Sequence, residues 1–498
     1  MNFLTIFEND IKVLFPELFL TISILALLMY GVVYSTSSHH DNPIIIRATG
    51  WLSIQILFLT ILLLINNPIH NQVFMNNLLV ADYFGLITKI VLLISSSIAI
   101  IISFDYIKKE RINSFEYMVL VLLGTLGMLL IISSYDLMSM YLAIEFQSLC
   151  LYVLAAFKRN SLFSVEAGLK YFVLGAFSSG IMLFGISILY GFTGVTGFED
   201  LGKLLIFSSN ESLLSSSGII LGIVFISVGL LFKIYAVPFH VWVPDVYQGS
   251  PTIVTAFFAI VPSISVLTLL TRLYSSVLHD LIQYWQPVFI FCSIASMLIG
   301  SLGALSQRRI KRLLAYSAIG HVGYVLIALS TGTPEGIRGL LVYIVIYIIM
   351  SACFFTILLS LRKRENNTQI VMIDELRALY KSNPILSLTL AIVLFSMAGI
   401  PPLAGFFSKL YVFLPAIHEG LFLLVVVGII ASVISAVYYL GLIKIMYFDK
   451  LDTWVSFEQV DKQKAIVLGL TTFLILFFFI YPSPLVLMSH KAALMICL

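Results

Sequence analysis

The chain has 498 residues, of which 60% are hydrophobic and only 11% are charged, whereas soluble domains carry about 25% charged residues. This composition excludes an ordinary soluble enzyme and indicates a protein whose helices lie in lipid. The formal net charge of +3 is too small to indicate nucleic-acid binding.

The first hydrophobic run follows a short acidic segment. Glu8 and Asp10 precede Lys12, which fits neither a basic secretory signal nor an arginine-rich, acid-poor transit peptide. We therefore expect this run to be a retained membrane helix.

Fourteen runs along the chain are long enough to cross a bilayer, which takes about 20 mainly apolar residues. In chain order they cover residues 14–34, 50–66, 80–104, 115–134, 137–157, 167–194, 217–242, 251–275, 282–305, 310–331, 336–361, 384–416, 420–446 and 464–484. The sequence therefore predicts an all-α polytopic membrane protein of about 14 transmembrane helices.

Lysine and arginine collect in alternate loops of this prediction. The loops after even-numbered helices hold little beyond Lys203 and Arg338. The loops after odd-numbered helices hold Arg47; Lys108, Lys109 and Arg111; Lys158 and Arg159; Arg308, Arg309, Lys311 and Arg312; Arg362, Lys363, Arg364, Arg377 and Lys381; and Lys450, Lys462 and Lys464. By the positive-inside rule, we expect the basic loops on the matrix or cytoplasmic side and both termini on the outer side.

Helices seven and twelve of this count each couple a lysine to proline. Helix seven contains Lys233 and Pro238, and helix twelve contains Pro401, Pro402 and Lys409. Proline frees the backbone carbonyl four residues back (Ile234 for Pro238; Met397 and Ala398 for the double proline), which a membrane tolerates only beside protein or water. Because five helices separate the two sites, they predict two inverted five-helix repeats (helices 4–8 and 9–13), each with a broken helix. Ordinary proline kinks are the alternative.

These repeats divide the chain into four parts. They are an N-terminal three-helix segment (1–112), a first five-helix repeat (113–278), a second five-helix repeat (279–447) and a C-terminal helix (448–498). The longest polar connections have only about 22 residues, and Cys150, Cys292, Cys353 and Cys497 are scattered without a CxxC pair. We therefore expect no metal site or iron–sulfur cluster, and any soluble cofactor on other chains.

Charges inside the predicted helices are the candidate site, because each costs roughly 2.5 to 3.5 kcal/mol at the bilayer centre. Glu145 and Lys233 lie well inside helices five and seven, and Lys409 follows the double proline. An acid and a lysine that face each other in a low dielectric change each other's proton affinity, so such a pair can toggle with a proton. The alternatives are a static ion pair for Glu145 and Lys233, and snorkelling to an interface for Lys409.

Further titratable groups are candidate relays. His321 can exchange protons near neutral pH, although a histidine on a small-residue face is also an ordinary packing donor. His240 lies in the broken helix seven, and Lys170 and Lys444 lie near predicted matrix-side helix ends, where snorkelling is the competing interpretation. Lys89, in helix three, falls outside both repeats and has no functional interpretation.

Several motifs surround these charges. They are Met140 to Leu149 around Glu145; Phe232-Lys233; Val237-Pro238-Phe239-His240; Pro244-Asp245-Val246-Tyr247; Gly249-Ser250-Pro251-Thr252; Arg312 to Ser317; Gly320-His321; and Gly399 to Phe406. Together they resemble the proton-translocating, antiporter-like membrane subunits of respiratory complex I, over nearly the whole chain. Within that family the chain is most similar to the subunit 2 branch. Lys409 stands where the subunit 4 type carries glutamate, and about fourteen residues after the last span leave no room for the lateral helix of subunit 5.

The resemblance implies a proton-translocating subunit of NADH:ubiquinone oxidoreductase in the mitochondrial inner membrane, with a bacterial plasma membrane as the alternative. It implies that Glu145 and Lys233 are the family's ion pair and that Lys409 is its helix-twelve lysine. It also implies no cofactor on this chain, because NADH, FMN, iron–sulfur clusters and ubiquinone belong elsewhere in the complex. The implied partners are other membrane-arm subunits, including antiporter-like ones, and lipids. The rival functions are a membrane subunit of a multisubunit cation/proton antiporter and, less directly, a solute transporter.

One position departs from the family pattern. Ser263 stands where the family places a central lysine on helix eight. A serine hydroxyl cannot hold a proton as a stable charge near neutral pH, but it can donate and accept hydrogen bonds and so hold a water. We therefore expect a hydrated gap at Ser263 that links Lys233 to His321 and on to Lys409.

Overall fold

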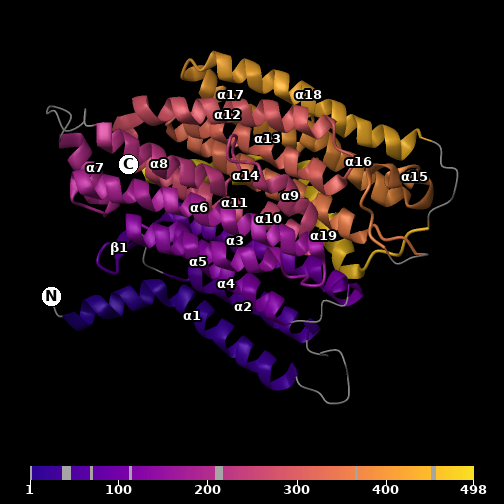
Figure 1. Ribbon diagram of the computed structural model, residues 1–498, viewed down its shortest axis with the longest axis horizontal. Helices are drawn as coiled ribbons and strands as arrows, with labels where there is room; N and C mark the ends of the chain where they lie inside the picture. Colours follow the sequence, from indigo (N-terminus) through magenta and orange to yellow (C-terminus); the bar gives the residue numbers. More distant parts are fainter. Residues whose placement is uncertain are drawn as a thin grey trace. The chain divides into compact units, whose positions relative to one another are not determined.

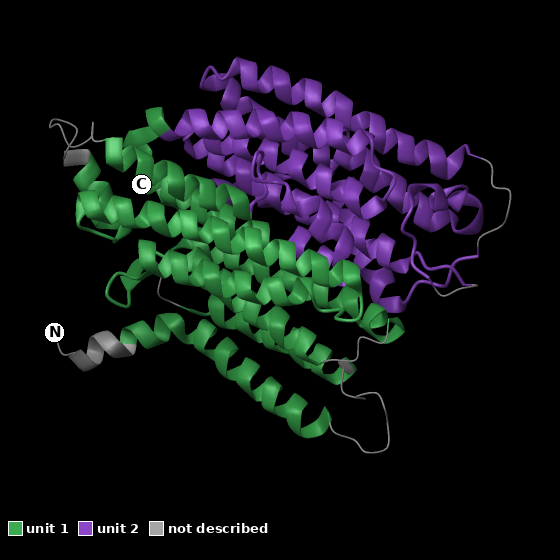
Figure 2. Ribbon diagram, viewed as in Figure 1, with its two compact units in different colours: residues 1–233, 261–284, 494–498 green, residues 234–260, 285–493 purple. Residues whose placement is uncertain are grey.

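The computed structural model describes residues 3–35, 46–67, 71–110, 115–207, 217–364, 368–449 and 456–497. Most of these residues are helical (Figure 1). The chain forms two compact units (Figure 2). Unit 1 comprises residues 1–233, 261–284 and 494–498, and unit 2 comprises residues 234–260 and 285–493. Arg111 and Lys450, two of the predicted basic loop residues, lie outside the described ranges.

Unit 1 holds helices from the N-terminal half of the chain and one hairpin. Its elements are α1 (Phe3–Ser35), α2 (Ile46–Ile65), β1 (Gln72–Phe74), β2 (Leu79–Ala81), α3 (Tyr83–Lys109), α4 (Glu116–Ser133), α5 (Leu137–Ala155), α6 (Leu162–Thr193), α7 (Phe198–Phe207), α8 (Ser217–Lys233), α11 (Pro262–Arg272), the π-helical turn η2 (Leu273–Val277) and the 3-10 turn η3 (His279–Leu281). Strands β1 and β2 pair antiparallel, with Val73 opposite Val80.

Unit 2 holds the helices of the C-terminal half and two short helices that precede α11 in the sequence. Its elements are α9 (Trp242–Gly249), α10 (Thr252–Ile260), most of α12 (Ile282–Leu305), α13 (Ile310–Ser330), α14 (Pro334–Ser360), the 3-10 turn η4 (Ile373–Leu376), α15 (Leu379–Ser382), α16 (Pro384–Ala398), α17 (Ala404–His418), α18 (Phe422–Tyr447), α19 (Lys462–Phe477) and most of α20 (Ser483–Cys497).

The predicted class, an all-α polytopic membrane protein, is confirmed. Among the described residues, eleven helices are long and apolar enough to cross a membrane. They coincide with eleven of the predicted runs, and the other three runs (217–242, 384–416 and 464–484) contain shorter helices. The count of fourteen spans and the inverted repeats stay predictions.

Two of these three runs, 217–242 and 384–416, are interrupted at the expected prolines. Helix α8 ends at Lys233, and a turn with Tyr235 at φ +52° and a cis Val237–Pro238 bond precedes α9. Helix α16 ends at Ala398, after which come Gly399 at φ +89° and a cis Pro401–Pro402 bond before α17. Backbone groups at such breaks need partners in an apolar surrounding.

Aspartates define where two helices of unit 1 begin. The Asp136 carboxylate accepts hydrogen bonds from the backbone N–H groups of Met138 (2.7 Å) and Ser139 (3.4 Å) at the start of α5. The Asp82 carboxylate accepts one from Gly85 N–H (3.0 Å) at the start of α3. These bonds satisfy donors that a helix start leaves unpaired. The cap at Asp136 fixes the start of α5, the helix that carries Glu145.

Some elements were not predicted from the sequence. The amphipathic helix α7 lies between predicted spans, and the β1–β2 hairpin lies between the second and third predicted spans except for its last two residues. Residues 448–498, expected to hold one helix, hold both α19 and α20. The hairpin, α7 and α20 are each shorter than the roughly 20 residues that a span requires, so a search for membrane-length runs passes over them.

Candidate functional site

Glu145 and Lys233 both belong to unit 1, on α5 and α8. The Lys233 ammonium donates a hydrogen bond to Tyr152 Oη (Nζ–Oη 3.2 Å) and lies 5.7 Å from the centre of the tyrosine ring. Glu145 Oε2 accepts a hydrogen bond from Ser148 Oγ (3.4 Å). Glu145 Oε1 is buried without a hydrogen-bond partner among the described residues.

These two charges act on each other electrostatically. In the part of the chain that the structure describes, however, no nitrogen–oxygen pair of Lys233 and Glu145 lies within the 4.0 Å of a direct salt bridge. Among the described residues, each of the two charges therefore contacts a hydroxyl group of α5 rather than the other charge.

Lys409 binds the end of the helix that precedes its own. Its side chain is buried, its Nζ donates a hydrogen bond to the carbonyl of Ala398 (2.9 Å), and it lies 5.1 Å from the centre of the Tyr324 ring. The last carbonyls of a helix lack partners and carry partial negative charge, so a cation is favoured there. Ala398 is one of the residues whose carbonyl the double proline was expected to free.

The backbone between α16 and α17 is shaped around this lysine. Gly399 has φ +89°, and a β-carbon at this position would lie 2.9 Å from Lys409 Nζ. The left-handed backbone therefore favours glycine, and any larger residue would also displace the end of the Lys409 side chain. The broken helix thus supplies a partner for Lys409 that the sequence did not identify.

His321, on α13, is buried among hydroxyl groups. Its Nδ1 is hydrogen-bonded to Tyr343 Oη (2.7 Å), and its Nε2 lies 3.4 Å from Tyr439 Oη. Tyr439 is in turn hydrogen-bonded to Ser317. Because each ring nitrogen meets a group that can donate or accept, this histidine can pass a proton from one side of its ring to the other.

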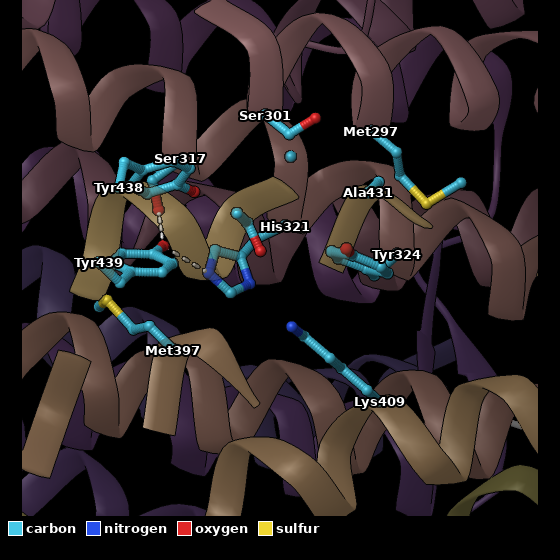
Figure 3. A pocket seen from close by; sticks show the side chains of 12 residues that line it. Met297, Ser301, Ser317, His321, Tyr324, Met397, Lys409, Ala431, Tyr438 and Tyr439 are labelled. Atoms are coloured by element: carbon cyan, nitrogen blue, oxygen red, sulfur yellow. Dashed lines mark hydrogen bonds between the residues drawn. The ribbon is translucent and has the colours of Figure 1, made fainter. Parts of the chain in front are cut away.

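A small cavity lies beside Lys409 and His321, and Figure 3 shows the lysine ammonium directed toward the imidazole. Its volume open to water-sized spheres is about 10 Å³, close to the minimum for one water. The cavity is lined by Met297, Ser301, Ser317, Gly320, His321, Tyr324, Met397, Lys409, Ala431, Ser435, Tyr438 and Tyr439. A single water there would join two protonatable groups of unit 2.

The remaining predicted residues lie in varied surroundings. Ser263 is buried in α11 of unit 1. His240 is half-buried in the turn after α8, and its Nδ1 is buried without a hydrogen-bond partner among the described residues. Lys444 is exposed in the last turn of α18, and the partly exposed Lys170 pairs with Glu166 at 2.8 Å. The hydrated link from Ser263 to His321 stays a prediction.

Two ion pairs of unit 1 were missed by the sequence analysis. Lys89 Nζ lies 2.5 Å from Glu17 Oε1, and both residues are buried. Arg272 Nη2 lies 2.8 Å from both carboxylate oxygens of Asp82. Glu17 was visible as an acid inside the first apolar run, but only the fold identifies Lys89 as its partner.

No group of three or more His, Cys, Asp or Glu side chains could hold a metal ion within the described ranges.

The family of the chain is evident from its similarity to known proteins. Residues 134–435 match the family described as NADH:quinone oxidoreductase/Mrp antiporter, transmembrane.

The similar sequences extend over almost the whole chain. NADH-ubiquinone oxidoreductase chain 2 of Marchantia polymorpha is 53% identical over 99% of this chain and 100% of the relative. The protein of the same name from Arabidopsis thaliana is 49% identical over 98% of this chain and 97% of the relative.

Solved structures show the same fold. A chain of respiratory complex I from Thermus thermophilus has a TM-score of 0.77 at 29% identity, covering 95% of this chain and 98% of that one. A chain of the Mrp complex from Dietzia sp. has a TM-score of 0.82 at 18% identity, covering 98% of both chains.

Proposed function

The chain belongs to the NADH:quinone oxidoreductase/Mrp antiporter family, and on this premise we propose that its buried charges carry protons across the membrane arm of complex I. It is an antiporter-like membrane subunit of NADH:ubiquinone oxidoreductase, of the chain 2 type. The complex as a whole is a proton-translocating oxidoreductase, and the other membrane-arm subunits are the partners of this chain.

A subunit of a cation/proton antiporter is the less favoured function. The Mrp complex is similar in fold, but at 18% identity that likeness extends to the fold alone. The relatives named as complex I chain 2 are 49% and 53% identical over almost the whole chain. The sequence likeness therefore favours complex I.

The observation that carries the proposed mechanism is that both lysines of the site, the partly buried Lys233 and the buried Lys409, have neutral contact partners. Lys233 binds the Tyr152 hydroxyl and Lys409 binds the Ala398 carbonyl. A buried ammonium that is locked to a carboxylate keeps its proton, whereas one held by neutral groups can lose it when its surroundings change. This arrangement supports proton exchange over the static ion pair.

In the proposed mechanism Glu145 and Lys233 form one protonatable pair, and Lys409 with His321 forms another. Electron transfer from NADH to quinone on other subunits changes the surroundings of these groups and hence their proton affinity. Ser263 holds water in place of the family's lysine. His240 and Lys444 serve as further relays, with Lys444 exchanging protons at the matrix-side end of α18.

The protein is a multi-pass membrane protein. We place it in the mitochondrial inner membrane, with both termini on the intermembrane-space side and the basic loops in the matrix. The orientation is supported by the alternation of lysine and arginine between loops, and the choice of membrane by the likeness to NADH-ubiquinone oxidoreductase chain 2 of plants. The redox cofactors of the complex are proposed to lie on other subunits.

The test uses the intact complex with Glu145→Gln, Lys233→Met or Lys409→Met in this chain. We expect each variant to lower proton translocation and NADH:ubiquinone activity several-fold. NADH oxidation by a water-soluble artificial acceptor should stay normal, because that reaction takes place on other subunits and involves no quinone step. Lys203→Met, on the exposed helix α7, is the control (side chain 60% exposed). Normal proton translocation in all three variants would refute the proposal.

A further inference from the structure

Two hydroxyl groups of α5 lie next to the charges of Glu145 and Lys233. Ser148 and Tyr152 follow Glu145 by three and seven residues on α5, so the three side chains share one face of that helix. Ser148 Oγ is 3.4 Å from Glu145 Oε2, and Tyr152 Oη is 3.2 Å from Lys233 Nζ. Ser148 and Tyr152 are four residues apart on α5, so their side chains are neighbours on the helix surface.

We propose that Ser148 and Tyr152 form a hydroxyl bridge along α5 that carries a proton between Lys233 and Glu145. The inference rests on the proposed function, because it assigns the route by which that pair exchanges its proton. A hydroxyl can carry a proton in this way since it accepts one hydrogen bond while it donates another.

The transfer balances bond by bond. The Lys233 ammonium gives a proton to Tyr152 Oη, the Tyr152 O–H proton passes to Ser148 Oγ, and the Ser148 O–H proton passes to Glu145 Oε2. Each bond that breaks is matched by one that forms. A charged amine and carboxylate become a neutral amine and carboxylic acid, which removes two charges from a buried site. Rotation of the two hydroxyls then resets the bridge.

Ser148 has two acceptors and can therefore open or close this bridge. Its hydroxyl donates to the backbone carbonyl of Glu145 at 3.0 Å and to the Glu145 carboxylate at 3.4 Å. Turned to the backbone, it makes the local bond that is usual for serine in a helix. Turned to the carboxylate, it completes the path.

The position of the Tyr152 hydroxyl is determined by α6. The Tyr152 ring packs edge-on against Tyr171, with ring centres 4.7 Å apart. A β-carbon at Gly175 would lie only 2.1 Å from Tyr152 Oη, so glycine makes the room that this hydroxyl occupies. If Tyr152 only filled space, its ring would be enough and its hydroxyl would be dispensable. Removing the hydroxyl alone therefore distinguishes a packing role from proton transfer.

The experiment compares Tyr152→Phe and Ser148→Ala with matched controls in the intact complex. Each change removes one hydroxyl and leaves the neighbouring side chains in place. We expect both variants to lower proton translocation and NADH:ubiquinone activity roughly tenfold or more, as when a positioned proton-transfer group is lost. The ratio of the rates in H2O and D2O should rise, because proton transfer becomes the slow step.

The controls are Tyr190→Phe and Ser187→Ala, which remove the same groups from exposed positions on α6. Both should keep native rates and isotope ratios. If Tyr152→Phe prevents assembly, Ser148→Ala decides, because it leaves the aromatic packing untouched.

Native proton translocation and isotope ratio in either assembled variant would overturn the bridge. The proposed function still stands in that case if Glu145→Gln and Lys233→Met are inactive. If those two variants are also native, the proposed function fails together with the bridge.

Discussion

Replacing Gly175 with alanine tests whether the placement of the Tyr152 hydroxyl matters without altering any proton-carrying group. The added β-carbon would lie 2.1 Å from Tyr152 Oη and 2.6 Å from Tyr152 Cζ. Ordinary contact begins near 3.4 Å, so the phenol must move by about 1.3 Å. A movement of that size breaks or misaligns the 3.2 Å hydrogen bond between Tyr152 and Lys233.

The expected magnitude follows from three opposing effects. Overpacking costs about 1 to 3 kcal/mol, and loss of a hydrogen bond to a charged group costs about 1.5 to 3 kcal/mol. Replacing glycine by alanine within a helix returns about 0.5 to 1 kcal/mol. We therefore expect Gly175→Ala to destabilise the subunit by about 2 to 5 kcal/mol.

Gly180→Ala, one and a half turns further along α6, is the matched control. A β-carbon at Gly180 meets nothing within 4 Å, so only the helix-favouring effect of alanine remains. The assay is proton translocation by the reconstituted complex, together with thermal inactivation of its NADH:ubiquinone activity. Gly175→Ala should lower both the rate and the inactivation temperature, and Gly180→Ala should lower neither. Native proton translocation in Gly175→Ala would refute the reasoning.

Other parts of the structure give further expectations. Glu17→Gln leaves the buried Lys89 ammonium without its carboxylate, so we expect the subunit to lose about 3 to 5 kcal/mol of stability. The loss should appear as a lower inactivation temperature, and adding Lys89→Met should partly reverse it. Burial, the largest influence, raises the pKa of Glu375, but hydrogen bonds from Lys363 and two backbone N–H groups together hold that pKa below its ordinary 4.5. The stability that the ionised Glu375 contributes is therefore present above pH 4.5 and is lost as the pH falls through the lowered pKa. Acid should then expose the surrounding loop to protease. Glu375→Gln should remove that pH dependence. Ser263→Lys should be tolerated if water reaches this buried position and should destabilise by several kcal/mol if the position is dry, which thermal inactivation distinguishes.

Much of the candidate site could be predicted from the sequence, because a membrane strongly restricts which residues can lie inside it. A charge or a proline inside an apolar run is costly there, so Glu145, Lys233 and Lys409 stand out by their position in the chain alone. The same reasoning located both helix breaks and the freed carbonyl at Ala398. Helical spacing also puts Ser148 and Tyr152 on the face of Glu145, since it decides which residues of one helix share a face.

Tertiary structure alone decided which groups from different helices meet. Lys89 had no interpretation until α1 brought Glu17 within 2.5 Å of it, and Lys409 had no partner until the break in α16 presented a carbonyl. Lys233 meets the hydroxyl of Tyr152, because glycine at position 175 leaves room for that hydroxyl. Hydropathy and spacing determine which residues enter the membrane, but the partner of a buried charge depends on the distance between helices that are far apart in sequence, which no local pattern encodes.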